Sequence, residues 1–341
     1  MLYDLMISHP MNVGNYNIGW GKALEEKNDE FLNSICEYFN ERLKNEPVSY
    51  ENSVWYSNVE RQKSIIDALI NKDLNYLHDT LKNLFSSPLT HGTAQGDEHY
   101  NMLVDNTDVQ KQYAQVYYDK LITLMEMNSI IPIFSPEEYY YVKRFDKYFN
   151  ISPEAFLKEL STRFEFDVSA PKYSGNLFGL DTKYGLYNER DFMSLGVALM
   201  VKERFDDKNI NICEIGGGVG HLAFYLHRLG YKNISIVDLP TISVSQMYFL
   251  SVNLDDNNVQ LISPQQFTGK YDLVLNVDSM TEMNIESAKE YCDKMENETQ
   301  NFISINHETN PFAVNQICNM RRISRHPFWL RKGYVFEEYR G

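Results

Sequence analysis

The sequence predicts an α/β fold, in which a mostly parallel sheet in the second half of the chain follows a mainly helical first half. Short apolar runs alternate with helical patterns from about residue 189 onward, an order that implies parallel strands joined by right-handed crossovers. Four glycines separate the first of these runs from the helical pattern that follows it. The preceding residues, up to about 170, show helical periodicity without clear strand alternation.

The length and composition suit a globular protein with two domains. The chain has 341 residues, of which 43% are apolar, and we expect two separate cores, in residues 1–171 and 172–341. No apolar run approaches the roughly 20 residues that span a bilayer, and the first residues lack the pattern of a signal peptide. The four cysteines form no Cys-x-x-Cys pair, so neither a zinc site nor a disulfide framework is expected. A cytoplasmic protein is therefore predicted.

The charge of the chain restricts its partners. The formal net charge is −15, and a surface of that sign repels phosphate backbones. One basic group of residues stands out, and a solvated face with a few salt bridges is its simpler interpretation: Arg321, Arg322, Arg325 and Arg331. We expect no nucleic-acid partner and no membrane insertion, although a single anionic group on a small substrate remains compatible with this charge.

The first half is predicted to be a helical domain that serves as a lid, substrate or oligomerisation domain. Helices are expected at residues 24–43, 59–84, 108–127 and 137–149. Ser135 and Ser152 are each followed by proline and glutamate, the residue order of a capped helix start. The polar stretch at 172–191 carries three glycines and several aromatic residues. It is either a lid and pocket wall or a packed interdomain linker.

The second half is predicted to alternate strands and helices. Helices are expected at residues 189–205 and 221–229. Strands are expected at residues 211–215, 233–237, 259–262, 272–277 and 301–305. Residues 323–330 and 333–339 form two further apolar runs joined by a short turn, which predicts a terminal antiparallel hairpin.

The glycines occupy the first strand-to-helix turn, where a ligand can approach the backbone closely. They are Gly216, Gly217, Gly218 and Gly220. A dinucleotide fingerprint, Gly-x-Gly-x-x-Gly, would need its third glycine at position 221, where His221 stands instead. This departure argues against a nicotinamide dehydrogenase.

Two acidic residues accompany the turn. Glu214 precedes it, and Asp238 follows the second strand, where a carboxylate can accept both ribose hydroxyls of a nucleoside. Glycines alone would be weak evidence of a nucleoside site. The complete order of strand, acidic residue, spaced glycines, helix, strand and second acidic residue is more specific.

This order resembles the first two motifs of the class I S-adenosylmethionine-dependent methyltransferases, here EIGGGVG (214–220) and Asp238. Residues 270–283, KYDLVLNVDSMTEM, look like the fourth-strand motif of that fold. The resemblance covers about residues 189–341 and implies a Rossmann-like seven-stranded sheet of order 3-2-1-4-5-7-6 with the seventh strand antiparallel. The segments VDLPTISVSQMYFL, SINHE and HPFWLRKGYVFEEY further resemble the sugar O-methyltransferases associated with bacterial surface polysaccharide synthesis.

The resemblance implies S-adenosylmethionine as cofactor. Its methionine part would contact the glycine turn, its ribose Asp238, and its adenine the residues after the third strand, unless Ser263, Gln265 and Gln266 form only a solvated loop. The expected cofactor contacts are Glu214, Gly216, Gly217, Gly218, Gly220, Asp238, Leu239, Ser263, Gln265 and Asn276.

A hydroxyl acceptor requires a general base. The first candidate is His307, which leaves the fifth strand between Asn306 and Glu308, and the second is Asp278. Glu282 lies four residues after Asp278 and could cap a helix, reach a hydroxyl or hold a metal. A divalent metal on Asp278, Glu282 and His307 is possible, but their spacing does not indicate it.

The remaining histidines receive lesser roles. His221 is expected to support the glycine turn, and His91 and His99 to lie in a loop.

The sequence thus predicts an S-adenosylmethionine-dependent O-methyltransferase that acts on a hydroxyl of a sugar or nucleotide-sugar precursor, either alone or as a homo-oligomer. One alternative is a methyltransferase for another capsule or small-molecule oxygen, such as a phosphate-like group. The other is a non-catalytic cofactor-binding scaffold whose helical half docks a partner.

Overall fold

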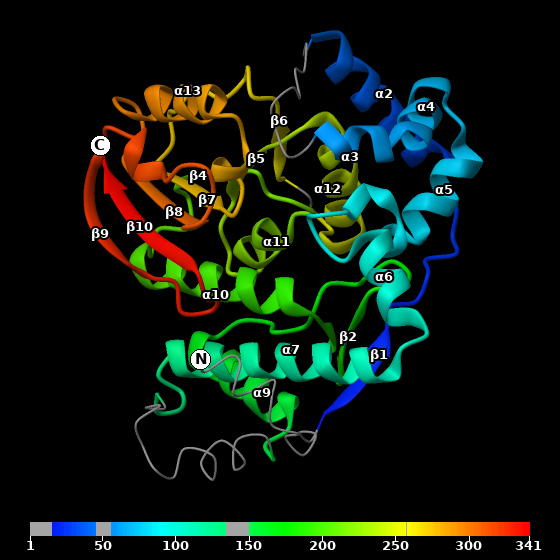
Figure 1. Cartoon of the computed structure of the whole chain (residues 1–341), viewed down its shortest axis with the longest axis horizontal. Coiled ribbons are helices and arrows are strands. Elements are labelled where there is room, and N and C mark those ends of the chain that lie inside the picture. The colour runs from blue at the N-terminus through cyan, green and yellow to red at the C-terminus, as the bar shows by residue number, and fades with distance from the viewer. Residues whose placement is uncertain (1–15, 46–55, 134–149, 257) are drawn as a thin grey trace.

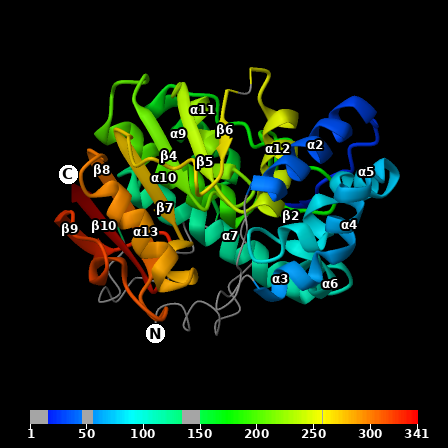
Figure 2. The same cartoon turned by 90° about the horizontal axis from the view of Figure 1, so that it is seen from above.

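The computed structural model describes residues 16–45, 56–133, 150–256 and 258–341. Figures 1 and 2 show the large sheet with the C-terminal hairpin at one side and the N-terminal helices, drawn blue to cyan, at the other. The helix expected at 137–149, with its start at Ser135, lies outside the described residues. Within the described ranges, no helix combines the length and the apolar character needed to cross a membrane.

The large sheet has seven strands in the order β6-β5-β4-β7-β8-β10-β9. Its strands are β4 (Asn211–Ile215), β5 (Asn233–Val237), β6 (Gln260–Ile262), β7 (Leu273–Val277), β8 (Asn301–His307), β9 (Arg321–Pro327) and β10 (Tyr334–Arg340). Neighbours pair in parallel from β6 to β8, whereas β10 runs antiparallel to both β8 and β9. Numbered along the chain, this order is 3-2-1-4-5-7-6, so the predicted fold is confirmed.

The predicted strands match closely. β4 and β5 agree residue for residue with the prediction, and β6 and β7 each start one residue later. β8 continues two residues further, to His307, because Tyr334 of β10 still pairs with it there. β9 starts at Arg321 and ends at Pro327, earlier than expected at both ends.

The sheet is covered on both faces, which explains why its strands read as continuous apolar runs. Ile212 and Leu273 contact one core, together with residues from α10 (Glu189–Arg204), α11 (His221–Arg228) and α12 (Pro240–Asn253). Cys213 and Val274 point to the other core, which includes residues of α13 (Ile285–Met295). Side chains one residue apart therefore serve opposite faces.

The first half is helical, as predicted, with different boundaries. Its helices are α2 (Asp29–Asn45), α3 (Tyr56–Arg61), α4 (Lys63–Asn71), α5 (Leu74–Lys82), α6 (Gly96–Val104), α7 (Thr107–Met127) and α9 (Pro153–Phe164). Short 3₁₀ turns are η1 (Leu84–Ser86) and η2 (Pro88–Thr90) in the first half, and η3 (Met280–Glu282) and η4 (Val314–Gln316) in the second. The single helix expected at 59–84 is divided, because Lys72 adopts a left-handed conformation and Asp73 caps the next helix by accepting from the Tyr76 N–H.

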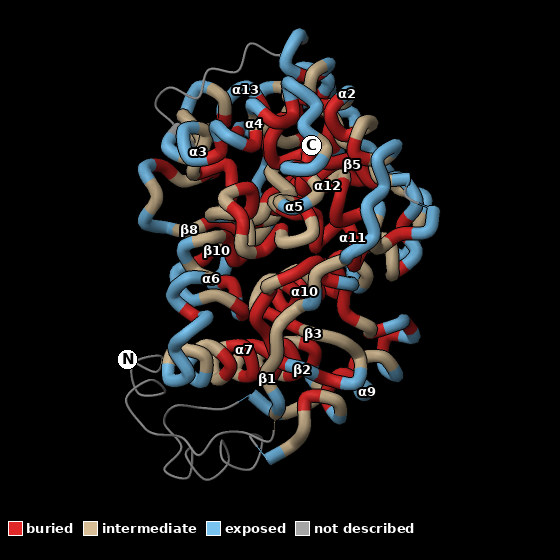
Figure 3. Tube along the Cα trace, turned by 90° about the vertical axis from the view of Figure 1, so that its right-hand side faces the viewer, coloured by how far each residue is buried: buried red, intermediate tan, exposed pale blue. Residues whose placement is uncertain are grey.

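The two halves share one buried cluster, whereas separate cores were expected. β1 (Asn17–Trp20), β2 (Phe178–Thr182) and β3 (Gly185–Tyr187) form a small sheet in which β1 pairs with β2 across the expected boundary. Leu32 and Leu121 of the first half belong to the same buried cluster as Leu195 and Ile212. Figure 3 shows buried segments, in red, in α7 of the first half and in α10 of the second half alike.

Most of the stretch at 172–191 is a packed connection rather than a lid. Tyr173 and Tyr187 are buried, and the hydroxyls of Tyr173 and Tyr225 both donate to the buried carboxyl of Asp191. Residues 173–187, all of them described, line no part of the cavity below. The pocket-wall interpretation fails for this segment because its aromatic rings face the shared core.

Candidate active site

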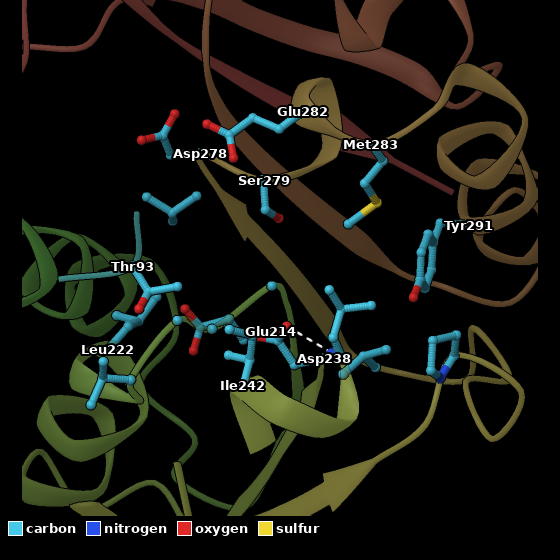
Figure 4. Close-up of a pocket in the computed structure, with 18 of the residues that line it drawn as sticks. Thr93, Glu214, Leu222, Asp238, Ile242, Asp278, Ser279, Glu282, Met283 and Tyr291 are labelled. Atoms are coloured by element: carbon cyan, nitrogen blue, oxygen red, sulfur yellow. Dashed lines mark hydrogen bonds between the residues drawn. The ribbon is translucent and has the colours of Figure 1, made fainter. Parts of the chain in front are cut away.

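A cavity of about 380 Å³ lies at the carboxyl ends of β4, β5 and β7, the position where open α/β sheets bind ligands. Figure 4 shows Glu214 of β4 and Asp238, which follows β5, on one side of the cavity. Asp278, Ser279 and Glu282 lie on the opposite side. The first half of the chain also contributes Thr93 and its neighbour Gly92.

The glycine turn has positive φ angles of 74°, 55° and 103° at Gly216, Gly218 and Gly220. A Cβ on Gly216 would lie 2.1 Å from the Ser279 Oγ, so only glycine fits there. A Cβ added to Gly218 would meet no atom closer than 3.6 Å, and Gly218 lines the cavity with Gly216 and Gly217. Gly220 does not line it. Its left-handed conformation starts α11, and the cofactor contact expected for it stays a prediction.

Glu214 is 3% exposed and lines the cavity. Its Oε2 atom has no hydrogen-bond partner among the described residues. Burial, followed by the charge of Asp238, raises the pKa of Glu214 to about 8. A buried polar oxygen without a partner is costly and indicates a missing donor, such as a ligand group.

Asp238 follows β5 and faces the same cavity. Its Oδ1 accepts from the Leu239 N–H at 2.8 Å, and its Oδ2 accepts from the Gln246 Nε2 at 2.8 Å. The surrounding protein desolvates this carboxyl and raises its pKa to about 7, against the lowering effect of these hydrogen bonds. Leu239 lines the cavity beside it.

Gln246 was not predicted from the sequence. It is fully buried on α12, and its Nε2 donates both to Asp238 and, at 2.9 Å, to the carbonyl oxygen of Gly218. It thereby joins the glycine turn to the carboxyl after the next strand. An amide within the uncharged run ISVSQMYFL was the signal that could have revealed it.

Asp278 lines the cavity in a left-handed conformation, with φ of 61°. Its backbone N–H donates to the Ile305 carbonyl at 2.8 Å. Its carboxylate accepts from the Arg331 guanidinium and, at 2.6 Å, from the Tyr334 hydroxyl. Glu282 lines the same wall, so the structure brings these two predicted carboxylates together.

His307 does not reach this cavity. Its Nδ1 accepts from the Thr309 N–H at 3.1 Å, and its Nε2 would lie 2.8 Å from a Cβ placed on Gly333. Its ring packs edge-on against Tyr334, whose hydroxyl bonds to Asp278. The structure therefore gives His307 an indirect connection to the site, in place of the direct one expected from its strand-end position.

Of three further predicted cofactor contacts, one lines the cavity and two lie outside its lining. Gln265 lines the cavity. Ser263 does not, because its backbone N–H and Oγ bond to Gln266. Asn276 is fully buried, and its amide donates to the Ile215 carbonyl at 2.9 Å and accepts from Asn306 at 2.7 Å. It supports the start of the glycine turn through Ile215, and the cofactor contact expected for it stays a prediction.

Arg190 is a second unpredicted residue of the wall. Its guanidinium approaches the Gly92 carbonyl at 3.4 Å and the Asp278 carboxylate at 4.0 Å, so it connects the loop of the first half to the end of β7. The capping box of Asn188 and Asp191 fixes the first turn of α10, where Arg190 lies.

Of the remaining histidines, His221 lines the cavity. His221 packs against Phe85, Tyr173 and Phe249, and burial lowers its pKa to about 3, so it is neutral beside the turn. His91 precedes Gly92 and lies 3.3 Å from Asp97. Burial also lowers the pKa of His99.

The cavity is predominantly acidic. Its lining includes the carboxyl groups of Glu214, Asp238, Asp278, Glu282 and Glu290. The lysine and arginine side chains in the same lining are Arg190 and Lys294. Such a lining favours a ligand that carries positive charge.

In the part of the chain that the structure describes, no three histidine, cysteine or acidic side chains gather to hold a metal ion. The four cysteines are free and buried. The C-terminal arginines pair with acidic residues, Arg322 with Glu337, Arg325 with Glu308 and Arg331 with Asp278.

Comparison with known proteins gives only distant structural similarity. No protein-family model matches the chain, and no curated protein matches it. Among solved structures, magnesium protoporphyrin IX methyltransferase from Synechocystis PCC 6803 with bound SAM is 15% identical, with a TM-score of 0.37 over 45% of this chain and 80% of that one. The glycopeptide N-methyltransferase MtfA complexed with sinefungin is 12% identical, with a TM-score of 0.35 over 42% and 92%. A protein of Pyrococcus horikoshii OT3 is 14% identical, with a TM-score of 0.37 over 44% and 90%.

Proposed function

We propose that the protein is an S-adenosylmethionine-dependent O-methyltransferase of the cytoplasm. Its acceptor would be a hydroxyl of a sugar or nucleotide sugar used for a bacterial surface polysaccharide. The observation that carries the cofactor assignment is the arrangement of Glu214 and Asp238 beside the glycine turn. Both carboxyl groups face one cavity, and Glu214 Oε2 has no partner among the described residues.

The residues present fit this cofactor. Asp238 would accept the ribose hydroxyls, and Glu214 Oε2 would accept an N–H or O–H group of the ligand. The missing Cβ of Gly218 leaves the backbone open to the methionine part. Leu239, Met283 and Tyr291 line the cavity with apolar surface that suits adenine.

The charge of the cavity favours S-adenosylmethionine over a dinucleotide as the cofactor. S-adenosylmethionine carries a sulfonium and an ammonium against a single carboxylate, whereas NAD carries a pyrophosphate. The predominantly acidic lining attracts the former and repels the latter. Arg190 is the cation near the glycine turn that could pair with a carboxylate.

When bound, S-adenosylmethionine supplies an electrophilic methyl group. The task of the chain is to hold the acceptor oxygen in line with that methyl, to exclude water and to take a proton. Asp278 is our first candidate for the general base that accepts this proton. It lines the cavity, and Tyr334 and Arg331 fix the orientation of its carboxylate. Glu282 is the second candidate. His307 lies outside the cavity lining and would act only through Tyr334, so it ranks behind both carboxylates.

The sugar assignment rests on the sequence resemblance and on the chemistry of the wall. Carboxylates at Asp278 and Glu282, with the guanidinium of Arg190, offer acceptors and donors suited to a polyhydroxyl compound. A phosphate-like acceptor would instead meet two carboxylates at this wall, which disfavours that alternative.

The test is methyl transfer from radiolabelled S-adenosylmethionine to a panel of nucleotide sugars and free sugars. Labelled product with at least one hydroxyl acceptor, lost in Asp278→Asn, is the expected result. Binding of S-adenosylhomocysteine without transfer to any acceptor would favour the non-catalytic scaffold.

A further inference from the structure

Helix α2 of the first half packs along α12, next to the cofactor side of the sheet (Figures 1 and 2). The ring centroids of Phe31 and Tyr248 lie 6.3 Å apart at one end of this contact. At the other end, Arg42 NH1 donates to the Ser243 Oγ at 3.2 Å. The two helices therefore run in opposite directions, and the last turns of α2 meet the first turns of α12.

Arg42 is the charged side chain at that meeting point. It is only 7% exposed. Its NH2 donates to the backbone carbonyl of Asp238 at 2.7 Å, and its NH1 also donates to the Tyr38 hydroxyl at 2.6 Å. Burying a guanidinium is costly unless its N–H groups are bonded, so this placement is specific.

The Asp238 carbonyl needs such a donor. β5 ends at Val237 and α12 begins at Pro240, so Asp238 lies between the ladder of the sheet and the hydrogen bonds of the helix. Arg42 fixes the backbone of this residue, while Leu239 and Gln246 fix its carboxylate. Together these contacts determine where the carboxylate points.

We propose that Arg42 is a positioning residue of the cofactor site, through which the N-terminal helix α2 holds Asp238 in the orientation that binds the ribose. This inference rests on the proposed function, because it assumes a nucleoside ligand. It implies that a residue of the helical half sets cofactor affinity without contacting the cofactor.

The charge of Arg42 also acts on Asp238. Burial raises the pKa of Asp238 to about 7, and Arg42 opposes that rise. The other ionisable group facing this carboxyl is Glu214 on β4, whose own pKa is raised by Asp238. Gln246 on α12 is neutral. Removing Arg42 should therefore raise the pKa of Asp238 further and move its titration to higher pH.

The experiment measures S-adenosylhomocysteine binding by calorimetry from pH 6 to 9 for the wild type, Arg42→Gln, Arg42→Lys and a control. The control is Lys72→Gln, which removes a cation that pairs with the exposed Glu37 on the same helix α2. We expect Arg42→Gln to weaken binding about tenfold at pH 7.5, the scale for losing a hydrogen bond from a charged group. Its affinity should recover at a higher pH than in the wild type. Arg42→Lys should restore part of the affinity, and Lys72→Gln should bind normally.

A second ligand separates positioning from general loss of structure. With the 2′-deoxy analogue of S-adenosylhomocysteine, which lacks one ribose hydroxyl, the effect of Arg42→Gln should be smaller than with the parent compound. An equal loss for both ligands, or unchanged binding and pH dependence in Arg42→Gln, would overturn the proposal. Failure of the wild type itself to bind S-adenosylhomocysteine would instead refute the proposed function.

Discussion

The carboxyl groups of Glu214 and Asp238 enter one cavity from neighbouring parallel strands, and the charge on Asp238 raises the pKa of Glu214. The pKa values are raised to about 8 for Glu214 and about 7 for Asp238. At neutral pH the native state therefore retains protons that the unfolded chain has already released.

This proton excess predicts how stability depends on pH. The free energy of unfolding of the ligand-free protein should fall as pH rises from about 4, the usual carboxyl value, to about 8 and then level off, because the native state binds more protons over that range. The lowered pKa of His221 gives the opposite slope, but only below about 6.5, the usual histidine value. Asp191, whose pKa burial raises to about 7, adds to the fall. Thermal melts at closely spaced pH values measure it.

Glu214→Gln should reduce that slope and raise the melting temperature at pH 8.5 by a few degrees, since it removes a buried charge. The same variant should bind S-adenosylhomocysteine more weakly. The exposed Glu286 provides a control, and Glu286→Gln should leave the slope unchanged. A slope as steep in Glu214→Gln as in the wild type would refute the assignment of these protons.

Gly218→Ala should separate binding from folding. The added Cβ meets no atom closer than 3.6 Å, so the cost to stability should be about 1–2 kcal/mol, from the left-handed backbone alone. The Cβ enters the cavity wall, however, and should weaken S-adenosylhomocysteine binding at least tenfold. Gly230→Ala is the matched control, because Gly230 also has positive φ with open space but lies outside the cavity lining. Equal affinities in the two variants would contradict the placement of the cofactor.

The base assignment predicts different outcomes for three variants. Asp278→Asn should lower turnover about 100-fold to 10,000-fold, the usual effect of losing a general base, with nearly unchanged cofactor affinity. Asparagine tolerates the left-handed conformation, so the backbone should be preserved. Glu282→Gln should have a smaller effect, and His307→Ala should retain turnover within about tenfold. Single-turnover rates measure all three, and a collapse confined to His307→Ala would return the role to histidine.

The shared core predicts that the second half cannot fold alone. A chain beginning at Tyr173 would lose β1 from the edge of β2 and the α7 surface that packs on α10. We expect it to show no cooperative thermal transition and no binding of S-adenosylhomocysteine. Circular dichroism melts test this directly, and a cooperative transition with retained binding would mean that the halves are independent.

The sheet could be predicted from the sequence because its signals are local. β4 and β5 are short apolar runs with clear ends, and the glycines mark the turn between β4 and α11. The break between α4 and α5 was not predictable, because the residue in the left-handed conformation is a lysine, and neither glycine nor proline marks the break in the sequence.

The candidate site was predictable only for residues whose place in it follows from the order of the strands in the sheet. Glu214, Asp238 and Asp278 lie in the cavity because each follows or ends a parallel strand at the same edge. His307 has the same kind of position along the chain, yet its ring packs against Tyr334 of the antiparallel strand β10. Thr93, Arg190 and Arg42 reach the site by tertiary packing, which periodicity does not encode.

The most direct measurement is a calorimetric titration of S-adenosylhomocysteine and NAD into the wild type and Asp238→Ala. The acidic cavity and the unpartnered Glu214 oxygen predict binding of S-adenosylhomocysteine and none of NAD. Asp238→Ala should weaken that binding by about 2–3 kcal/mol, the scale for leaving the ribose hydroxyls unpaired. Binding of NAD, or no binding of S-adenosylhomocysteine by the folded wild-type protein, would contradict the account.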